Sequence, residues 1–135
     1  MFDLRRVSTI AVMLLSILLP IQAYAIDLTG AWATELDLCG RVFTKKGNEI
    51  VFSELSDLYG SGFIVQGNRI RGKSTRCTIT SRKEDGETLN LFATCSTTIM
   101  NSNVQFSLKV IDENKIIRMF SDIPGMSLAY SRCAP

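Results

Sequence analysis

The four cysteines are the residues of this chain with the most definite chemistry. They are Cys39, Cys77, Cys95 and Cys133 in a chain of 135 residues. An even number of cysteines in a short exported chain is typical of a disulfide framework. Zinc is the alternative, but the chain has neither a C-x-x-C pair nor a histidine, so the usual ligand spacings are missing. We therefore predict two disulfides, no metal site and no cofactor, and the spacing alone allows three pairings.

The residue types also limit which enzymes the chain could be. Without histidine, neither a Ser-His-Asp triad nor a Cys-His pair can form, and oxidised cysteines are not nucleophiles. Paired carboxylates could still carry out acid and base chemistry, as they do in glycosidases. The densest acidic groups are Glu35 with Asp37, and Glu84 with Asp85 and Glu87. We expect no catalytic residue, and a carboxylate-dependent hydrolase of envelope polysaccharide is the alternative.

Basic residues form one possible anion-binding stripe. Arg69, Arg71 and Lys73 alternate, so in a strand they share one face, and Arg76 is close by. Such a stripe could attract phosphate, an anionic polysaccharide or an acidic protein. The alternative is a solvated outer face whose charges discourage edge-to-edge pairing.

The N-terminus has the three parts of a secretory signal. Arg5 and Arg6 precede an apolar run over residues 7–21, and Ala23-Tyr24-Ala25 supplies a small-x-small cleavage pattern. The run is shorter than the roughly 20 residues of a membrane-spanning helix. We predict a signal peptide over residues 1–25, no membrane anchor after cleavage, and a periplasmic or secreted protein. The short leader and the lack of an N-x-S/T sequon favour a bacterial source.

The length and the net charge of the chain limit the number of domains and the kinds of partner that it can have. Residues 26–135 are enough for one domain with one core. The 15 Lys and Arg and 13 Asp and Glu include Arg5, Arg6 and Asp3 of the leader, so the rest of the chain is nearly neutral. This balance gives no support for a nucleic-acid partner.

Short stretches of alternating apolar and polar residues, separated by Gly, Asn, Asp or Pro, predict an all-β domain. The expected strands are 28–36, with 42–44 continuing it or forming a second strand, and then 49–54, 63–66, 69–72, 76–81, 88–97, 104–111, 115–120 and 126–133. Residues 55–61 are expected to form a loop or one short helical turn. Asp85-Gly86 is a favoured hairpin turn, and Cys77 and Cys95 are equidistant from Gly86, so a symmetric hairpin places them opposite each other.

An antiparallel meander leaves two free edges unless its first and last strands pair. We therefore predict a small up-and-down barrel of about eight strands, with a two-sheet sandwich as the alternative. Closure brings the strand before Cys39 beside the strand that ends at Cys133. The predicted pairs are therefore Cys77 with Cys95 and Cys39 with Cys133.

The two ends of the domain resemble one known group of proteins. Leu28-Thr29-Gly30-Ala31-Trp32 is similar to the G-x-W opening of calycin barrels, which include lipocalins, avidins and bacterial metalloprotease inhibitors. In that group a basic residue near the end of the last strand packs over the tryptophan, and Arg132 stands in that position. The resemblance implies a barrel with structural roles for Trp32 and Arg132. It does not extend to a biotin site, because Trp32 is the only tryptophan.

We expect a non-enzymatic binding module, because the usual catalytic sets are missing and the two ends are calycin-like. Its partner would be a small apolar molecule held inside, or an exported protein or envelope polymer held at the rim. A structural envelope component is a further alternative. The expected rim loops are residues 55–61 and 121–126, with Leu58, Tyr59, Ile123 and Met126 as apolar contacts.

Overall fold

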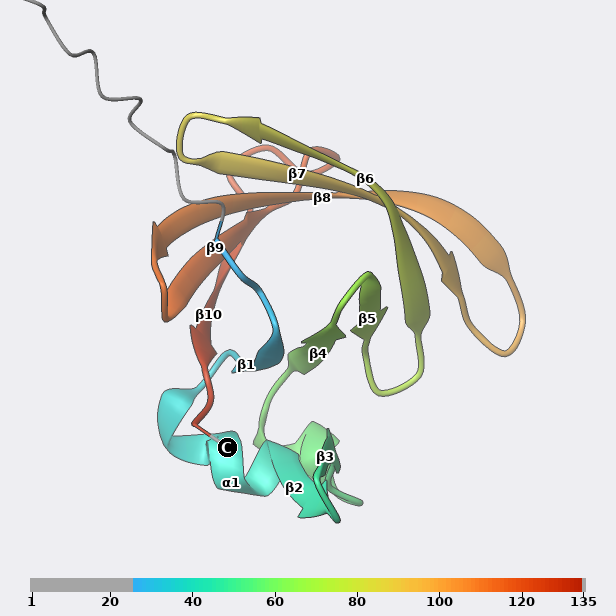
Figure 1. Cartoon of the computed structure of the whole chain (residues 1–135), viewed down its shortest axis with the longest axis vertical. Coiled ribbons are helices and arrows are strands. Elements are labelled where there is room, and N and C mark those ends of the chain that lie inside the picture. Colours follow the sequence, from blue (N-terminus) through green and yellow to red (C-terminus); the bar gives the residue numbers. More distant parts are fainter. Residues whose placement is uncertain (1–25, 135) are drawn as a thin grey trace, which may run out of the picture.

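The computed structural model describes residues 26–134, so the predicted signal peptide lies outside the described residues. Within these residues the protein is all-β, with one four-residue α-helix and two 3₁₀ turns (Figure 1). No described helix has the length and apolar character needed to cross a membrane. The elements in chain order are β1 (Gly30–Ala33), η1 (Leu36–Leu38), α1 (Cys39–Val42), β2 (Phe43–Lys46), β3 (Glu49–Phe52), η2 (Ser56–Tyr59), β4 (Gly62–Gln66), β5 (Arg69–Arg71), β6 (Arg76–Asp85), β7 (Thr88–Ser96), β8 (Asn101–Asp112), β9 (Lys115–Met119) and β10 (Ser127–Arg132).

Eight of the strands form a closed antiparallel barrel in the order β1-β10-β9-β8-β7-β6-β5-β4. The first and last barrel strands pair, with Trp32 opposite Arg132, and β1 also pairs with β4. This closure removes the two edges that an open meander would leave. The predicted all-β barrel of eight strands is therefore confirmed, and the sandwich alternative is not.

The inner core follows from the alternation along the strands. In β7, Leu89, Leu91, Ala93 and Cys95 are buried, while the residues between them are half-buried or exposed. These apolar side chains face the barrel axis because successive residues of a strand point to opposite sides. The β6–β7 hairpin turns at Gly86, whose φ of 61° suits glycine, and the resulting register places Cys77 opposite Cys95.

A second, smaller core lies on the outer face of β1 and β4. Ala31 and Ala33 of β1 and Ile64 of β4 are covered there by Val42 and Phe43. The two-stranded sheet β2–β3 and α1 therefore lie outside the barrel, at the opposite side of the molecule from β6, β7 and β8 (Figure 1). Both faces of β1 and β4 are consequently buried.

The prediction of a first strand over residues 28–36 was wrong in extent, whereas the alternative in which residues 42–44 form a second strand agrees with β2. The strand β1 ends at Ala33, and the chain then turns through η1 and α1 before it enters β2. The β2–β3 hairpin turns at Gly47, whose φ is 66°. The expected helical turn after Leu55 is present as η2.

Two disulfides join the predicted pairs. Cys77–Cys95 crosses neighbouring strands of the barrel with a Cα–Cα distance of 4.0 Å. Cys39–Cys133 links α1 to the residue after β10, with a Cα–Cα distance of 5.6 Å. The Cys133 amide also donates to the Ala31 carbonyl at 2.8 Å, so this bridge ties the outer core to the closure of the barrel.

The two bridges are expected to differ in their contribution to stability. They close loops with sequence separations of 94 and 18 residues. In the chain-entropy model such loops contribute about 4 to 5 and about 3 kcal/mol. Replacing both Cys39 and Cys133 with alanine should therefore lower the free energy of unfolding in urea more than replacing both Cys77 and Cys95. Equal losses, or the reverse order, would show that the bridges do not act mainly through the unfolded chain.

Candidate ligand-binding site

One end of the barrel is closed by Trp32 and Arg132. Trp32 is fully buried, and its indole Nε1 donates to the Leu28 carbonyl at 2.8 Å. The guanidinium carbon of Arg132 lies 4.3 Å from the centre of the Trp32 ring, within the range of a cation–π interaction. The guanidinium also donates to three carbonyls, those of Asp27, Thr29 and Glu113. Arg132 thus fixes the N-terminal segment and the β8–β9 turn over the tryptophan.

Gly30 makes the close approach of Arg132 possible. Its φ is +129°, which disfavours residues with a Cβ, and a Cβ built there would lie 3.4 Å from Arg132 Nη1. The glycine and the tryptophan of the G-x-W pattern therefore have separate physical roles, one in the backbone and one in the core. This geometry agrees with the structural roles that the calycin resemblance implies for Trp32 and Arg132.

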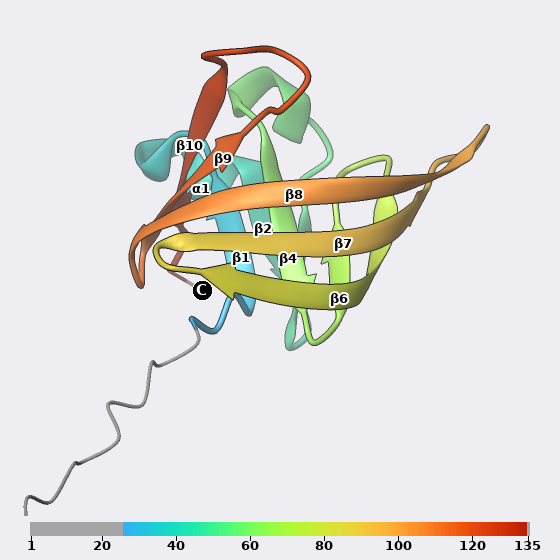
Figure 2. The ribbon, with the colours of Figure 1, turned by 90° about the horizontal axis from the view of Figure 1, so that it is seen from above.

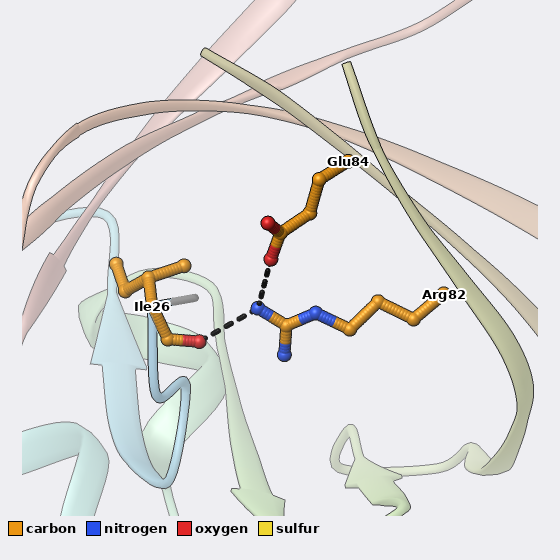
Figure 3. A network of polar contacts seen from close by, with 3 residues as sticks. All are labelled: Ile26, Arg82 and Glu84. Carbon is orange, nitrogen blue, oxygen red and sulfur yellow. Dashed lines mark hydrogen bonds and ion pairs between the residues drawn. The ribbon is translucent and has the colours of Figure 1, made fainter. Parts of the chain in front are cut away.

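A second arginine holds the start of the described chain. Arg82 on β6 donates to the Ile26 carbonyl at 2.8 Å and to the Glu84 carboxylate at 3.0 Å (Figure 3). Close by, hydrogen bonds from Thr29 lower the pKa of the Asp27 carboxyl below its ordinary value. The segment before β1 is therefore held across the closed end by two arginines, Arg82 and Arg132.

The barrel encloses an apolar cavity of about 380 Å³ that reaches the opposite end. Phe63 packs edge-on against Tyr130 with ring centres 4.9 Å apart, and its other neighbour is Trp32 at 6.3 Å. Phe63 and Tyr130 line the cavity, and Trp32 does not, so the tryptophan supports the floor from below. The apolar lining consists of Leu28, Phe63, Val65, Ile70, Cys77, Leu91, Cys95, Met100, Val104, Phe106, Leu108 and Tyr130.

Polar side chains and loops surround the mouth of the cavity. Apart from Tyr130 of the floor, the hydroxyl-bearing lining residues are Ser61, Thr75, Thr97 and Ser102. The β7–β8 connection extends beyond the other loops (Figure 2), and its Ile99 is 89% exposed, while Met100 next to it lines the cavity. The mouth therefore offers hydrogen-bonding groups beside exposed apolar ones.

Arg118 is the one charged residue among the described residues that line the cavity. It is half-buried near the end of β9, opposite Leu108 of β8 and Leu128 of β10. Its guanidinium carbon lies 4.7 Å from the ring centre of Phe106 and 4.6 Å from that of Phe120. Two aromatic rings thus hold a positive charge at the wall of an apolar cavity.

The acidic groups singled out in the sequence lie away from this cavity. Glu35 and Asp37 are exposed at η1, and Glu84, Asp85 and Glu87 surround the β6–β7 turn. None of these five residues lines the cavity. These carboxylates therefore could not act on a molecule bound in the cavity.

The predicted basic stripe lies on and after β5. Arg69 and Arg71 share the outer face, since Ile70 between them is buried. Arg71 pairs with the carboxylate of Glu49 at 3.1 Å, and Lys73 pairs with that of Asp57 at 2.9 Å. The strand β5 is thereby tied to the outer core, and two of the four charges are already neutralised. This favours a structural role for the stripe over anion binding.

None of the four predicted rim contacts lines the cavity: Leu58, Ile123 and Met126 are exposed, and Tyr59 packs against the outer core. Leu58 and Ile123 are 72% and 53% exposed in the connections that hold η2 and join β9 to β10. Sequence reasoning missed Met100 and Arg118. The alternation of Ile116, Arg118 and Phe120 was a usable signal, because it places one cation on the apolar face of a strand.

Arg132 is expected to contribute strongly to stability. The substitution Arg132→Met removes the cation over Trp32 and three hydrogen bonds, so the free energy of unfolding should fall by about 2 to 3 kcal/mol. The loss from Arg132→Lys should be smaller, because lysine keeps the charge but not the forked donor geometry. Urea unfolding followed by circular dichroism measures both, and Arg76→Met at an exposed position is the control. Wild-type stability of Arg132→Met would contradict this role.

Comparison of the chain with protein-family models, with curated proteins and with solved structures gave no match. The cavity, its aromatic floor and Arg118 are therefore the observations on which a function can be argued. No family can be stated for the chain beyond the small closed β-barrel that the structure establishes.

Proposed function

We propose that the protein is an exported, non-enzymatic binding module that holds a small apolar molecule inside its barrel. The observation that carries this proposal is the apolar cavity of about 380 Å³, closed at the Trp32 end and reached from the other. Binding sites for small molecules are concave and mostly apolar, with a few polar groups, and measure about 300 to 1,000 Å³. The cavity has each of these properties.

The size of the cavity argues against its being a packing defect. Protein interiors are close-packed, and voids larger than a water molecule are few. Unfilled apolar space also costs stability, because the lining side chains lose their packing partners. A barrel of this size could fill its interior with side chains. A retained space lined by phenylalanine, leucine and valine is therefore best explained by an occupant.

The chemistry of the lining supports binding more than catalysis. Among the described residues that form it, the only charged one is Arg118, and both cysteines are joined in a disulfide. Such a lining supplies apolar contact and hydrogen-bond donors at fixed positions. These groups hold and orient a molecule without transferring a proton or forming a covalent bond to it.

Two further observations support the remaining parts of the proposal. Two disulfides are typical of proteins in an oxidising compartment, which supports the periplasmic or secreted assignment. The contact of Arg132 with Trp32 and the closed barrel support a calycin-like assignment. An eight-stranded barrel can hold one small ligand, as in lipocalins, which agrees with the proposed function.

The proposal predicts that filling the cavity abolishes binding. Val104 lines the cavity on the inner face of β8, and Val104→Phe adds a ring to that space. The neutral fluorophore N-phenyl-1-naphthylamine should bind the wild type with a blue-shifted, enhanced emission, and Val104→Phe should reduce its affinity at least about tenfold. Fluorescence titration of the purified, disulfide-bonded protein measures this.

The matched control places the same ring outside the barrel. Asn103 precedes Val104 in β8 and is exposed, so Asn103→Phe should leave the affinity for the fluorophore unchanged. Thermal unfolding of both variants verifies that they fold. The proposed function is wrong if the wild type does not bind the fluorophore, or if Val104→Phe binds it as tightly as Asn103→Phe does.

A further inference from the structure

The orientation of Arg118 is set by its strand. Ile116, two residues earlier in β9, is completely buried in the inner core, so Arg118 projects to the same side. The ladder between β8 and β9 ends at the pair Ser107 and Met119, one residue beyond Arg118. Arg118 therefore lies where these two strands part, on the inner side of the wall and at the edge of the cavity.

Arg118 differs from the other half-buried arginines in having no polar partner. Arg71 bonds a carbonyl and a carboxylate, and Arg132 bonds three carbonyls; the exposed Arg82 also bonds a carbonyl and a carboxylate. Within residues 26–134, Arg118 makes neither a side-chain hydrogen bond nor an ion pair. Its guanidinium stacks on the rings of Phe106 and Phe120. Stacking on rings holds a guanidinium in place without using its N–H donors.

A guanidinium with free donors at an apolar cavity is suited to one kind of ligand group. Five N–H donors in a planar fork match the two oxygens of a carboxylate, and such charge-assisted pairs are stronger than hydrogen bonds between neutral groups. One positive charge balances one negative charge. A dianionic group such as a phosphate monoester would keep an unbalanced charge beside apolar side chains, which is unfavourable.

We propose that the occupant of the cavity is an apolar molecule that carries a single carboxylate, bound by Arg118. Its acid group lies at the mouth against the guanidinium, and its apolar part extends toward the floor formed by Phe63 and Tyr130. This inference rests on the proposed function, since it names the class of the molecule that the same cavity holds. Phe106 and Phe120 act as positioning residues that fix the guanidinium.

The test compares two molecules of equal chain length that differ in the head group. Isothermal titration with decanoate and with 1-decanol, both below their aggregation limits, should show decanoate bound at least about tenfold more tightly by the wild type. Arg118→Met should weaken decanoate binding roughly 10- to 100-fold and change the affinity for 1-decanol by less than about twofold. Arg76→Met, an exposed arginine outside the lining, should leave both affinities unchanged.

The outcomes separate this inference from the proposed function. Equal binding of decanoate and 1-decanol, or unchanged decanoate binding by Arg118→Met, would refute the carboxylate site while cavity binding stands. Tighter binding of decyl phosphate than of decanoate would also refute it. Absence of binding of the neutral fluorophore by the wild type would instead refute the proposed function. If Arg118→Met does not fold, Arg118→Gln replaces it, and the head-group comparison on the wild type decides without any variant.

Discussion

The pairing of β1 with β10 is the interaction on which the rest of this structure depends. It places Trp32 opposite Arg132, and the guanidinium then covers the indole and bonds three backbone carbonyls. Without this pairing the barrel would be an open sheet with two free edges, and its apolar inner face would have no opposite wall. Closure, the plugged end and the enclosed cavity are therefore consequences of one strand pair.

The outer core strengthens the same place. The strands β1 and β4 are short, and α1, β2 and β3 cover their outer side, so their apolar residues are buried on both faces. Gly62 belongs to this arrangement, because a Cβ there would lie 2.5 Å from the Trp32 carbonyl oxygen and 2.8 Å from the Phe43 ring. The Cys39–Cys133 bridge adds a covalent link between the outer core and β10.

The strands in which apolar and polar residues alternate could be predicted from the sequence. The end of β1 and the packing of β2–β3 outside the barrel could not, because they depend on tertiary contacts. The β6–β7 hairpin follows from alternation and a glycine turn, so the Cys77–Cys95 register could be predicted from the chain alone. The alternation of apolar and polar residues continues past Ala33, so it does not indicate that β1 ends there. For this reason the predicted first strand was longer than β1. Alternation also cannot tell that the β2–β3 hairpin packs outside the barrel. Alternation places Arg118 on the inner face of β9, but that it stacks on Phe106 of β8 depends on the pairing of the two strands and could not be read from the chain.

The mouth of the cavity follows from unequal strand lengths. The strand β8 has 12 residues, whereas its neighbour β9 has five, and β8 pairs with β7 from Asn101 but with β9 only from Ser107. In the first half of β8, inward side chains such as Val104 therefore have no strand β9 beside them. The cavity opens along this half of β8, where Ser102 and Val104 line it. The inner core is packed around Trp32 and Ile116, and Arg118 lies above this core at the mouth, where β8 and β9 part.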